Sequence, residues 1–264
     1  MVFGSYVRTQ EHEDIDLLLV LEEIEKNRIE RIEDIVGFKR KIHAPLDLLL
    51  LSKEECRANF RNHNPLFLEI AMDGEILLDT HNFLRSLMEE TRTYIKEKKI
   101  RRTTTEWVFP TEKREIPLSD VTNKDWAESW LKDAKRDLKS AKILYQQELY
   151  EKTVYHAQQC VEKAVKATLI CFGRFAKTHY VADILRKEMK QRDLDESVLE
   201  TLIHISEQLE PHHSLRRYPW ISDAQIWVPS KEYDQETAND ALQNAQKAIS
   251  LTREFLQKCF GKEC

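Results

Sequence analysis

The chain contains few of the residues that interrupt helices, only 5 glycines and 7 prolines among 264 residues. Chains rich in tight turns, and Pro/Gly-rich disordered chains, have more of both. Charged residues make up 33% of the sequence and hydrophobic residues 41%. This composition argues against a β-sandwich or a disordered chain and predicts a soluble, helix-rich protein long enough for two domains.

The sequence also lacks long apolar runs and a strong charge of one sign. Its longest apolar stretches, such as 17–21, are too short to cross a bilayer. The first residues do not combine a basic segment, an apolar core and a cleavage site, so we expect no signal peptide. A net charge of -5 gives no overall attraction to nucleic acid or anionic lipid. We therefore expect a cytoplasmic protein without a membrane partner.

Cysteines are scattered and odd in number. None of the five belongs to a C-x-x-C pair, and none is spaced with histidines as in a zinc site. We expect free thiols, as in a reducing cytoplasm. The five are Cys56, Cys160, Cys171, Cys259 and Cys264.

The first twenty residues carry the clearest chemical pattern. A Gly4-Ser5 turn precedes Asp14 and Asp16, which lead into the apolar segment 17–20. Side chains at i and i+2 of a strand share a face, so the two carboxylates should project together. Mg²⁺ is commonly held by one or two carboxylates and substrate phosphates, and a glycine turn offers backbone N–H groups to a phosphate. The pattern predicts a metal-dependent nucleoside triphosphate site.

A third carboxylate follows in the next apolar segment. Residues 45–51 predict a strand buried on both faces, and Asp47 is the single charge within it. A buried carboxylate needs a metal, a cation or a cavity. The alternative is that Asp47 stands at a strand end and faces water.

This N-terminal pattern resembles the polymerase-β-type nucleotidyltransferases, in particular their minimal branch. The matching residues are Gly4, Ser5, Arg8, Asp14 and Asp16, whereas Val7, Thr9 and Glu13 depart from the usual pattern. The resemblance implies catalytic, metal-binding aspartates at 14, 16 and 47, and nucleotide binding by Gly4, Ser5 and Arg8. It also implies Mg²⁺ or Mn²⁺ as cofactor and ATP as substrate.

The remaining periodicity predicts an α+β chain of two domains. We expect a nucleotidyltransferase domain over 1–98 with a small mixed sheet, a linker over 99–121 and an all-α bundle over 122–264. In the first domain we expect strands at 14–20, 45–51 and 75–79 and helices over 21–41 and 81–98. In the second we expect helices from 123 to about 145, then over 149–172, 178–185, 194–209 and 235–259, with a long connection over 211–233.

The helical part carries a second resemblance. The segment 157–167, the pair Thr178-His179 and the segment 217–219 are similar to the HEPN domain, and the match covers 123–260. HEPN ribonucleases share an R-x4-6-H motif, which Arg174 and His179 fit by spacing. In the alternative, Thr178 caps a helix and His179 packs beside it. The candidate HEPN site residues are Lys163, Lys166, Arg174, His179, Arg217 and Tyr218.

Together the two resemblances imply a fusion, similar in layout to kanamycin-nucleotidyltransferase-like proteins. We expect an enzyme that transfers AMP from ATP to a hydroxyl of a protein, an RNA or a small molecule, and a homodimer formed through the HEPN domain. One alternative is a toxin–antitoxin-type module whose HEPN domain cleaves RNA without metal. Another is a catalytically silent nucleotide-binding protein.

Overall fold

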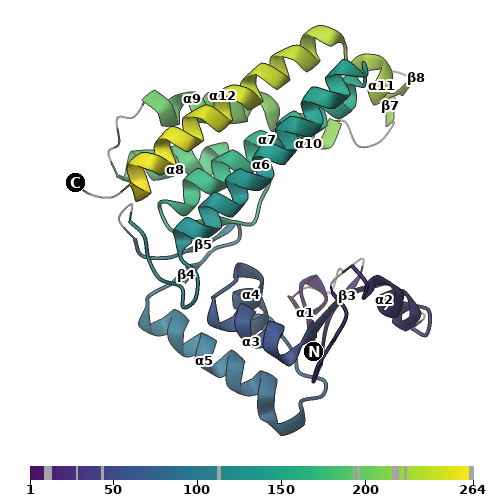
Figure 1. Ribbon diagram of the computed structural model, residues 1–264, viewed down its shortest axis with the longest axis vertical. Coiled ribbons are helices and arrows are strands. Elements are labelled where there is room, and N and C mark those ends of the chain that lie inside the picture. The colour runs from purple at the N-terminus through teal and green to yellow at the C-terminus, as the bar shows by residue number, and fades with distance from the viewer. Residues whose placement is uncertain are drawn as a thin grey trace. The chain divides into compact units, whose positions relative to one another are not determined.

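The computed structural model describes residues 1–8, 14–27, 29–42, 45–111, 114–192, 194, 197–215, 220–222 and 225–261. The fold is mixed α+β and mostly helical (Figure 1). The chain divides into two compact units. Unit 1 is Met1–Ile100 with Leu118–Val121, and unit 2 is Arg101–Pro117 with Thr122–Cys264.

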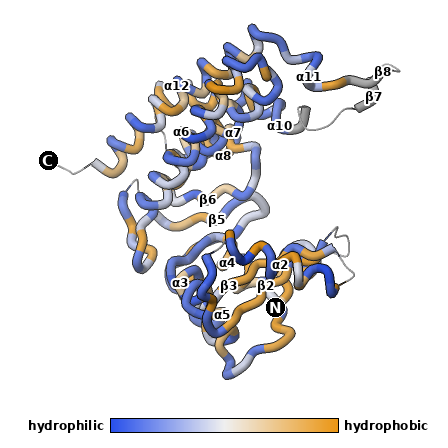
Figure 2. The backbone as a smooth tube through the Cα atoms, turned by 45° about the vertical axis from the view of Figure 1, so that its right-hand side comes forward, coloured by the Kyte–Doolittle hydropathy of each residue, from blue (hydrophilic) through white to orange (hydrophobic). Residues whose placement is uncertain are grey.

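Unit 1 contains a three-stranded sheet in the order β1-β2-β3. The strands are β1 (Val2–Phe3), β2 (Ile15–Leu21) and β3 (Leu46–Ser52). β1 runs antiparallel to β2, whereas β2 and β3 are parallel. Leucines dominate β2 and β3, so both strands stand out as hydrophobic in Figure 2. The predicted strands at 14–20 and 45–51 are thus present.

Helices complete unit 1. They are α1 (Ser5–Arg8), α2 (Ile32–Lys39), α3 (Lys53–Arg61), α4 (Pro65–Asp73) and α5 (Phe83–Glu97), with a 3-10 turn η1 (Thr80–Asn82). Ser52 starts α3 with a capping box, in which its hydroxyl accepts the N–H of Glu55. The core joins Leu18 and Leu51 of the sheet to Phe60, Phe67 and other apolar side chains of α3, α4 and α5.

Two predicted elements of unit 1 differ in the structure. Only α2 remains of the helix expected over 21–41: residues 22–27 are irregular and residues 29–31 form a turn. The strand expected over 75–79 is absent: Glu75 makes a single antiparallel bridge with Val2. Since β1 is only two residues long, it offers no further backbone partners, and Leu77 and Leu78 remain exposed.

Unit 2 begins with a second small sheet, ordered β4-β5-β6 and antiparallel throughout. Its strands are β4 (Arg101–Arg102), β5 (Glu106–Val108) and β6 (Arg174–Ala176). The range 99–121, which we expected to be a linker, therefore supplies two strands to unit 2. Trp107 is fully buried there, and Phe109 packs edge-on against Phe175.

The rest of unit 2 is a helical bundle around α7. The helices are α6 (Asn123–Gln146), α7 (Tyr150–Ile170), α8 (Ala182–Gln191), α9 (Ser197–Leu209), α10 (His212–Leu215), α11 (Pro229–Glu232) and α12 (Gln235–Phe260). α7 packs against α6, α12 and α9, and most of its side chains are buried. Buried alanines such as Ala241 and Ala245 line α12.

Two details of the bundle correct the sequence-based expectations. The helix expected to begin at Thr178 begins at Ala182 instead, because the Thr178 hydroxyl accepts the N–H of Tyr180 in a short turn. The connection over 211–233 contains α10, the hairpin of β7 (Trp220–Ser222) and β8 (Gln225–Trp227), and α11. Among the described residues, no helix has the length and apolar character needed to cross a membrane.

Candidate functional site

Two of the predicted carboxylates of unit 1, Asp16 and Asp47, lie on neighbouring strands, and Asp16 adjoins the Gly4 turn. Asp16 on β2 is the register partner of Asp47 on β3, so the two parallel strands place these residues side by side. Gly4 has a left-handed φ of 76°, and a Cβ built on it would lie 1.8 Å from Oδ2 of Asp16. The carboxylate therefore occupies space that only a glycine leaves open.

Burial and the neighbouring charges both act on the pKa of the Asp16 carboxyl group. Burial raises the pKa of Asp16, and the negative charges of Asp14 and Asp47 raise it further. Arg8 and the backbone N–H of Ser5, which donates to the carboxylate, oppose this pKa rise. The other predicted residues of this site, Gly4, Ser5, Arg8, Asp14 and Asp47, thus either border Asp16 or act on its charge.

Arg8 and Asp47 differ from the expectation in their surroundings. Nη1 of Arg8 lies 3.0 Å from Glu69 and 3.6 Å from Asp73, both on α4. Its charge is therefore shared between α4 and the aspartates. Asp47 is exposed to solvent, so the burial expected for it is not found and its carboxylate needs no partner to offset burial.

A second group of polar side chains gathers in unit 2 around Glu162 of α7. Glu162 is only 5% exposed. One carboxylate oxygen lies 3.0 Å from Nδ1 of His179 and 3.0 Å from Nζ of Lys166. The His213 ring of α10 stacks on the His179 ring with centroids 3.9 Å apart. The structure thereby joins two predicted HEPN site residues, Lys166 and His179, through Glu162.

Lys166, beside this group, stabilises the ionised form of Glu162. Burial acts to raise the pKa of Glu162, but the charge and hydrogen bond of Lys166, with a hydrogen bond from Gln158, hold it below its ordinary value. A histidine held by an ionised, buried carboxylate is fixed in orientation and can exchange protons with a ligand. The His179 side chain is 47% exposed, so a ligand in solvent can reach it.

The other predicted HEPN residues are held elsewhere. Arg174 on β6 pairs with Glu106 of β5 at 2.9 Å and with Glu188 of α8. Lys163 pairs with Asp133 and Asp137 of α6. Both cations are therefore bound to acidic groups within unit 2. Arg217 and Tyr218 lie outside the described residues.

Glu162 and His213 were not among the predicted site residues. For Glu162 a signal was available, because it precedes Lys166 by one helical turn on a buried face. No comparable signal marks His213, which lies 34 residues after His179 in the sequence. Only the packing of α10 against α7 brings it to the group.

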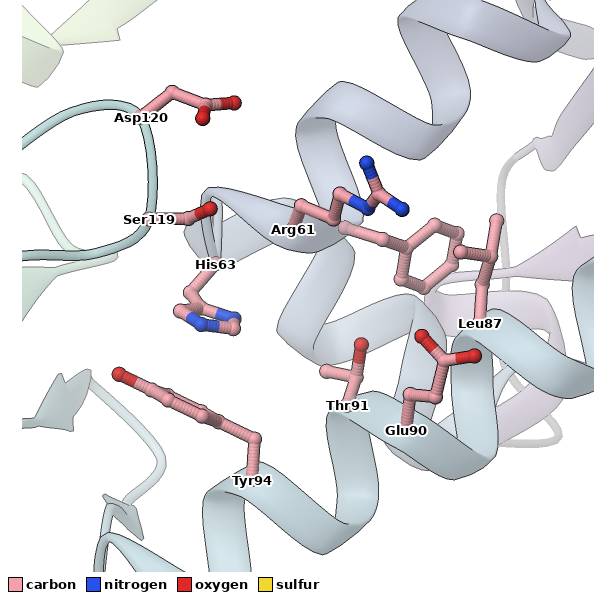
Figure 3. A pocket seen from close by; sticks show the side chains of 9 residues that line it. Arg61, His63, Leu87, Glu90, Thr91, Tyr94, Ser119 and Asp120 are labelled. Atoms are coloured by element: carbon pink, nitrogen blue, oxygen red, sulfur yellow. The ribbon is translucent and has the colours of Figure 1, made fainter.

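Unit 1 also contains a cavity of about 350 Å³ that the sequence did not predict (Figure 3). The ring of His63, after α3, stacks on Tyr94 of α5 with centroids 3.5 Å apart. Arg61, Glu90 and Thr91 line the same cavity, as do Ser119 and Asp120 of the returning segment 118–121. Burial lowers the pKa of His63 to about 4, so the ring is neutral near pH 7.

Comparison with known proteins identifies the helical part of the chain. The HEPN domain family matches residues 127–257. The protein named "Putative toxin MJ1304" of Methanocaldococcus jannaschii is 35% identical over 142 residues, which cover 53% of this chain and 93% of that protein. The chain therefore belongs to the HEPN domain family through the helices of unit 2.

More distant similarity was found as well. The protein named "Putative protein adenylyltransferase MJ1305", also of Methanocaldococcus jannaschii, is 28% identical over 127 residues, covering 46% of this chain and 80% of that protein. Two solved structures each match 49% of this chain and 97% of the chain in that structure. They are TT1696 from Thermus thermophilus (27% identity, TM-score 0.41) and ST0689, an archaeal HEPN homologue (23%, 0.40).

Proposed function

We propose that unit 1 is a minimal nucleotidyltransferase that transfers AMP from ATP to a hydroxyl of a protein, an RNA or a small molecule. The observation that carries this proposal is the close approach of Asp16 to Gly4 beside Asp47. A glycine turn beside adjacent carboxylates would suit a triphosphate bound together with a metal ion that the carboxylates hold. The similarity to a protein named as an adenylyltransferase supports the same chemistry.

The donor set fits Mg²⁺. Aspartate oxygens are the hard ligands that Mg²⁺ prefers. Burial raises the pKa of Asp16 most, and the charges of Asp14 and Asp47 add a repulsion that a cation would relieve. Asp14, Asp16 and Asp47 would hold the metal, which supplies charge neutralisation for the phosphates. The Gly4 turn and Ser5 would position the triphosphate, and Arg8 would offset part of its charge.

The test is the transfer of label from α-labelled ATP to the chain itself or to added acceptors, with Mg²⁺ or Mn²⁺. The double variant Asp14→Asn, Asp16→Asn keeps side-chain size and removes both charges. Label transfer by the wild type and its loss in the double variant are expected. Asp34→Asn is the matched control, since Asp34 lies on α2 of the same unit and pairs with Lys26 at the surface. Transfer that persists in the double variant would overturn the proposal.

A second candidate function concerns the HEPN domain. The hydrogen bond between exposed His179 and buried Glu162 favours acid–base cleavage of RNA, in which a ligand-accessible imidazole exchanges protons with the ribose or the leaving oxygen. Lys166 keeps Glu162 ionised and so keeps the imidazole oriented. The similarity to a protein named as a toxin fits this activity.

RNA cleavage in the presence of a chelator tests this second function. Cleavage by the wild type and its loss in His179→Ala are expected, because the exposed His179 ring carries the hydrogen bond to Glu162, whereas the neighbouring His213 ring is buried. His156→Ala is the control: His156 also pairs with a carboxylate, Asp137 at 2.9 Å, yet lies outside the group. Cleavage that survives in His179→Ala, or that requires a divalent metal, would exclude this function.

A further inference from the structure

The side chains around Glu162 also form a donor set of a different kind. Among the described residues, Glu162, His179 and His213 are the one trio of His, Cys, Asp or Glu whose ligand atoms all lie within 4.8 Å of one another. The trio comes from three separate segments: helix α7, the turn before α8, and helix α10. The tertiary fold therefore gathers these three potential ligands at one point.

Two imidazoles and one carboxylate match the preferences of a particular group of metals. Imidazole nitrogen suits Zn²⁺, Ni²⁺ and Co²⁺, and two histidines with a glutamate form a recurrent three-ligand zinc set that leaves a position open. Ligand atoms around a tetrahedral ion lie somewhat more than about 3 Å apart. The pair His179 and Glu162, at 3.0 Å, is already near that spacing.

The carboxylate is held as an oriented ligand. Nε2 of Gln158 donates to Oε2 of Glu162 at 3.1 Å, and Nε2 of Gln159 lies 3.4 Å from the same oxygen. Hydrogen bonds of this kind orient the ligands of metal sites and increase metal affinity. His213 is 8% exposed, whereas the His179 side chain is 47% exposed. The group is therefore anchored on its buried side and open to solvent on the other.

One cation already lies at this carboxylate. Nζ of Lys166 is 3.0 Å from Oε1 of Glu162 and balances its charge. The same ammonium lies 5.4 Å from the centre of the Trp130 ring, whose face can hold a cation. Lys166 therefore keeps a favourable contact with Trp130 when another cation takes its place at Glu162.

We propose that Glu162, His179 and His213 bind a divalent transition metal of the Zn²⁺ class in exchange for the Lys166 ammonium. The ion replaces one positive charge with two beside the same carboxylate, and both histidines bind in their neutral forms. Solvent reaches the metal through the exposed side of His179. This site is separate from the proposed nucleotidyl transfer and does not rest on RNA cleavage.

Binding of Zn²⁺ and Co²⁺ to the full-length chain tests the proposal, by competition against a metal-sensitive dye and by visible absorption of Co²⁺. We expect one ion per chain. Tetrahedral Co²⁺ with nitrogen and oxygen ligands gives visible bands without the thiolate charge-transfer band that cysteine ligands produce. His179→Gln and Glu162→Gln should each weaken binding by at least about tenfold. Lys166→Met removes the competing cation and should tighten binding.

The matched control is His156→Gln, which removes another histidine of α7 that pairs with a carboxylate outside the trio. Its affinity should equal that of the wild type. His179→Gln changes an exposed side chain, so it should fold normally, and its circular dichroism spectrum checks this. No binding by the wild type, binding unchanged in folded His179→Gln, or a Co²⁺ spectrum of thiolate ligation would each overturn the proposal.

Discussion

The Asp16 carboxylate lies over the backbone of Gly4, so closely that a Cβ on Gly4 would stand 1.8 Å from its Oδ2. Gly4 also has a positive φ of 76°, which side chains rarely adopt. Residues 14 to 16 and the first turn are thus coupled through a single close approach. A ligand that contacts both the aspartates and the Gly4 turn depends on this close approach.

Gly4→Ala should therefore destabilise the protein by about 2 kcal/mol or more, from backbone strain and from displacement of the Asp16 carboxylate. Urea denaturation measures the change. Gly37→Ala is the control, because no atom lies within 4 Å of its added Cβ. In α2 that change should be neutral or stabilise by up to about 1 kcal/mol. Equal effects of the two substitutions would contradict the close approach.

Asp16→Asn should stabilise the folded protein near neutral pH. Burial and the charges of Asp14 and Asp47 raise the pKa of Asp16, so its ionised form is less favourable in the folded than in the unfolded chain. The gain of the variant should shrink as the pH falls through the raised pKa and vanish below the ordinary value of 3.8. Denaturation of both proteins across this range is the measurement. A variant that is less stable than the wild type at pH 7 would contradict a raised pKa of Asp16.

His63 should titrate far below an ordinary histidine. Burial lowers the pKa of His63 from 6.5 to about 4. Since the unfolded chain takes up the proton first, His63 contributes stability above pH 6.5 that is lost as the pH falls toward 4. NMR titration of the imidazole, assigned with His63→Phe, checks the pKa. The phenylalanine keeps an aromatic ring beside Tyr94 (Figure 3) and should remove this part of the pH dependence.

Arg174→Ala should cost about 3–5 kcal/mol, because it leaves Glu106 and the buried Glu188 without this cation. Burial raises the pKa of Glu106 while Arg174 opposes that rise, so the pKa of Glu106 should climb further in the variant. Arg186→Ala is the control: its pairs with Asp183 and Glu207 are exposed and should contribute less than about 1 kcal/mol. Thermal and urea unfolding of both variants provide the comparison. A loss at Arg174 no larger than at Arg186 would show that the buried ion pairs are not needed for stability.

Local pattern accounts for much of what could be predicted. The four-residue spacing of apolar and small residues in α6, α7 and α12 follows from the helical repeat, because one face of each helix must be buried. The continuous leucines of β2 and β3 likewise follow from burial in a sheet. Where the pattern was weak, as at 75–79, the number of available backbone partners decided the outcome.

The sequence by itself determined the Gly4 turn, the pair Asp14 and Asp16, and the helical face of α7, since each depends on residues close together along the chain. Tertiary structure alone decided that Asp47 faces solvent, that Arg174 is held by Glu106, and that His213 stacks on His179. These relationships join segments far apart in the sequence. They follow from how whole elements pack, and no local repeat records them.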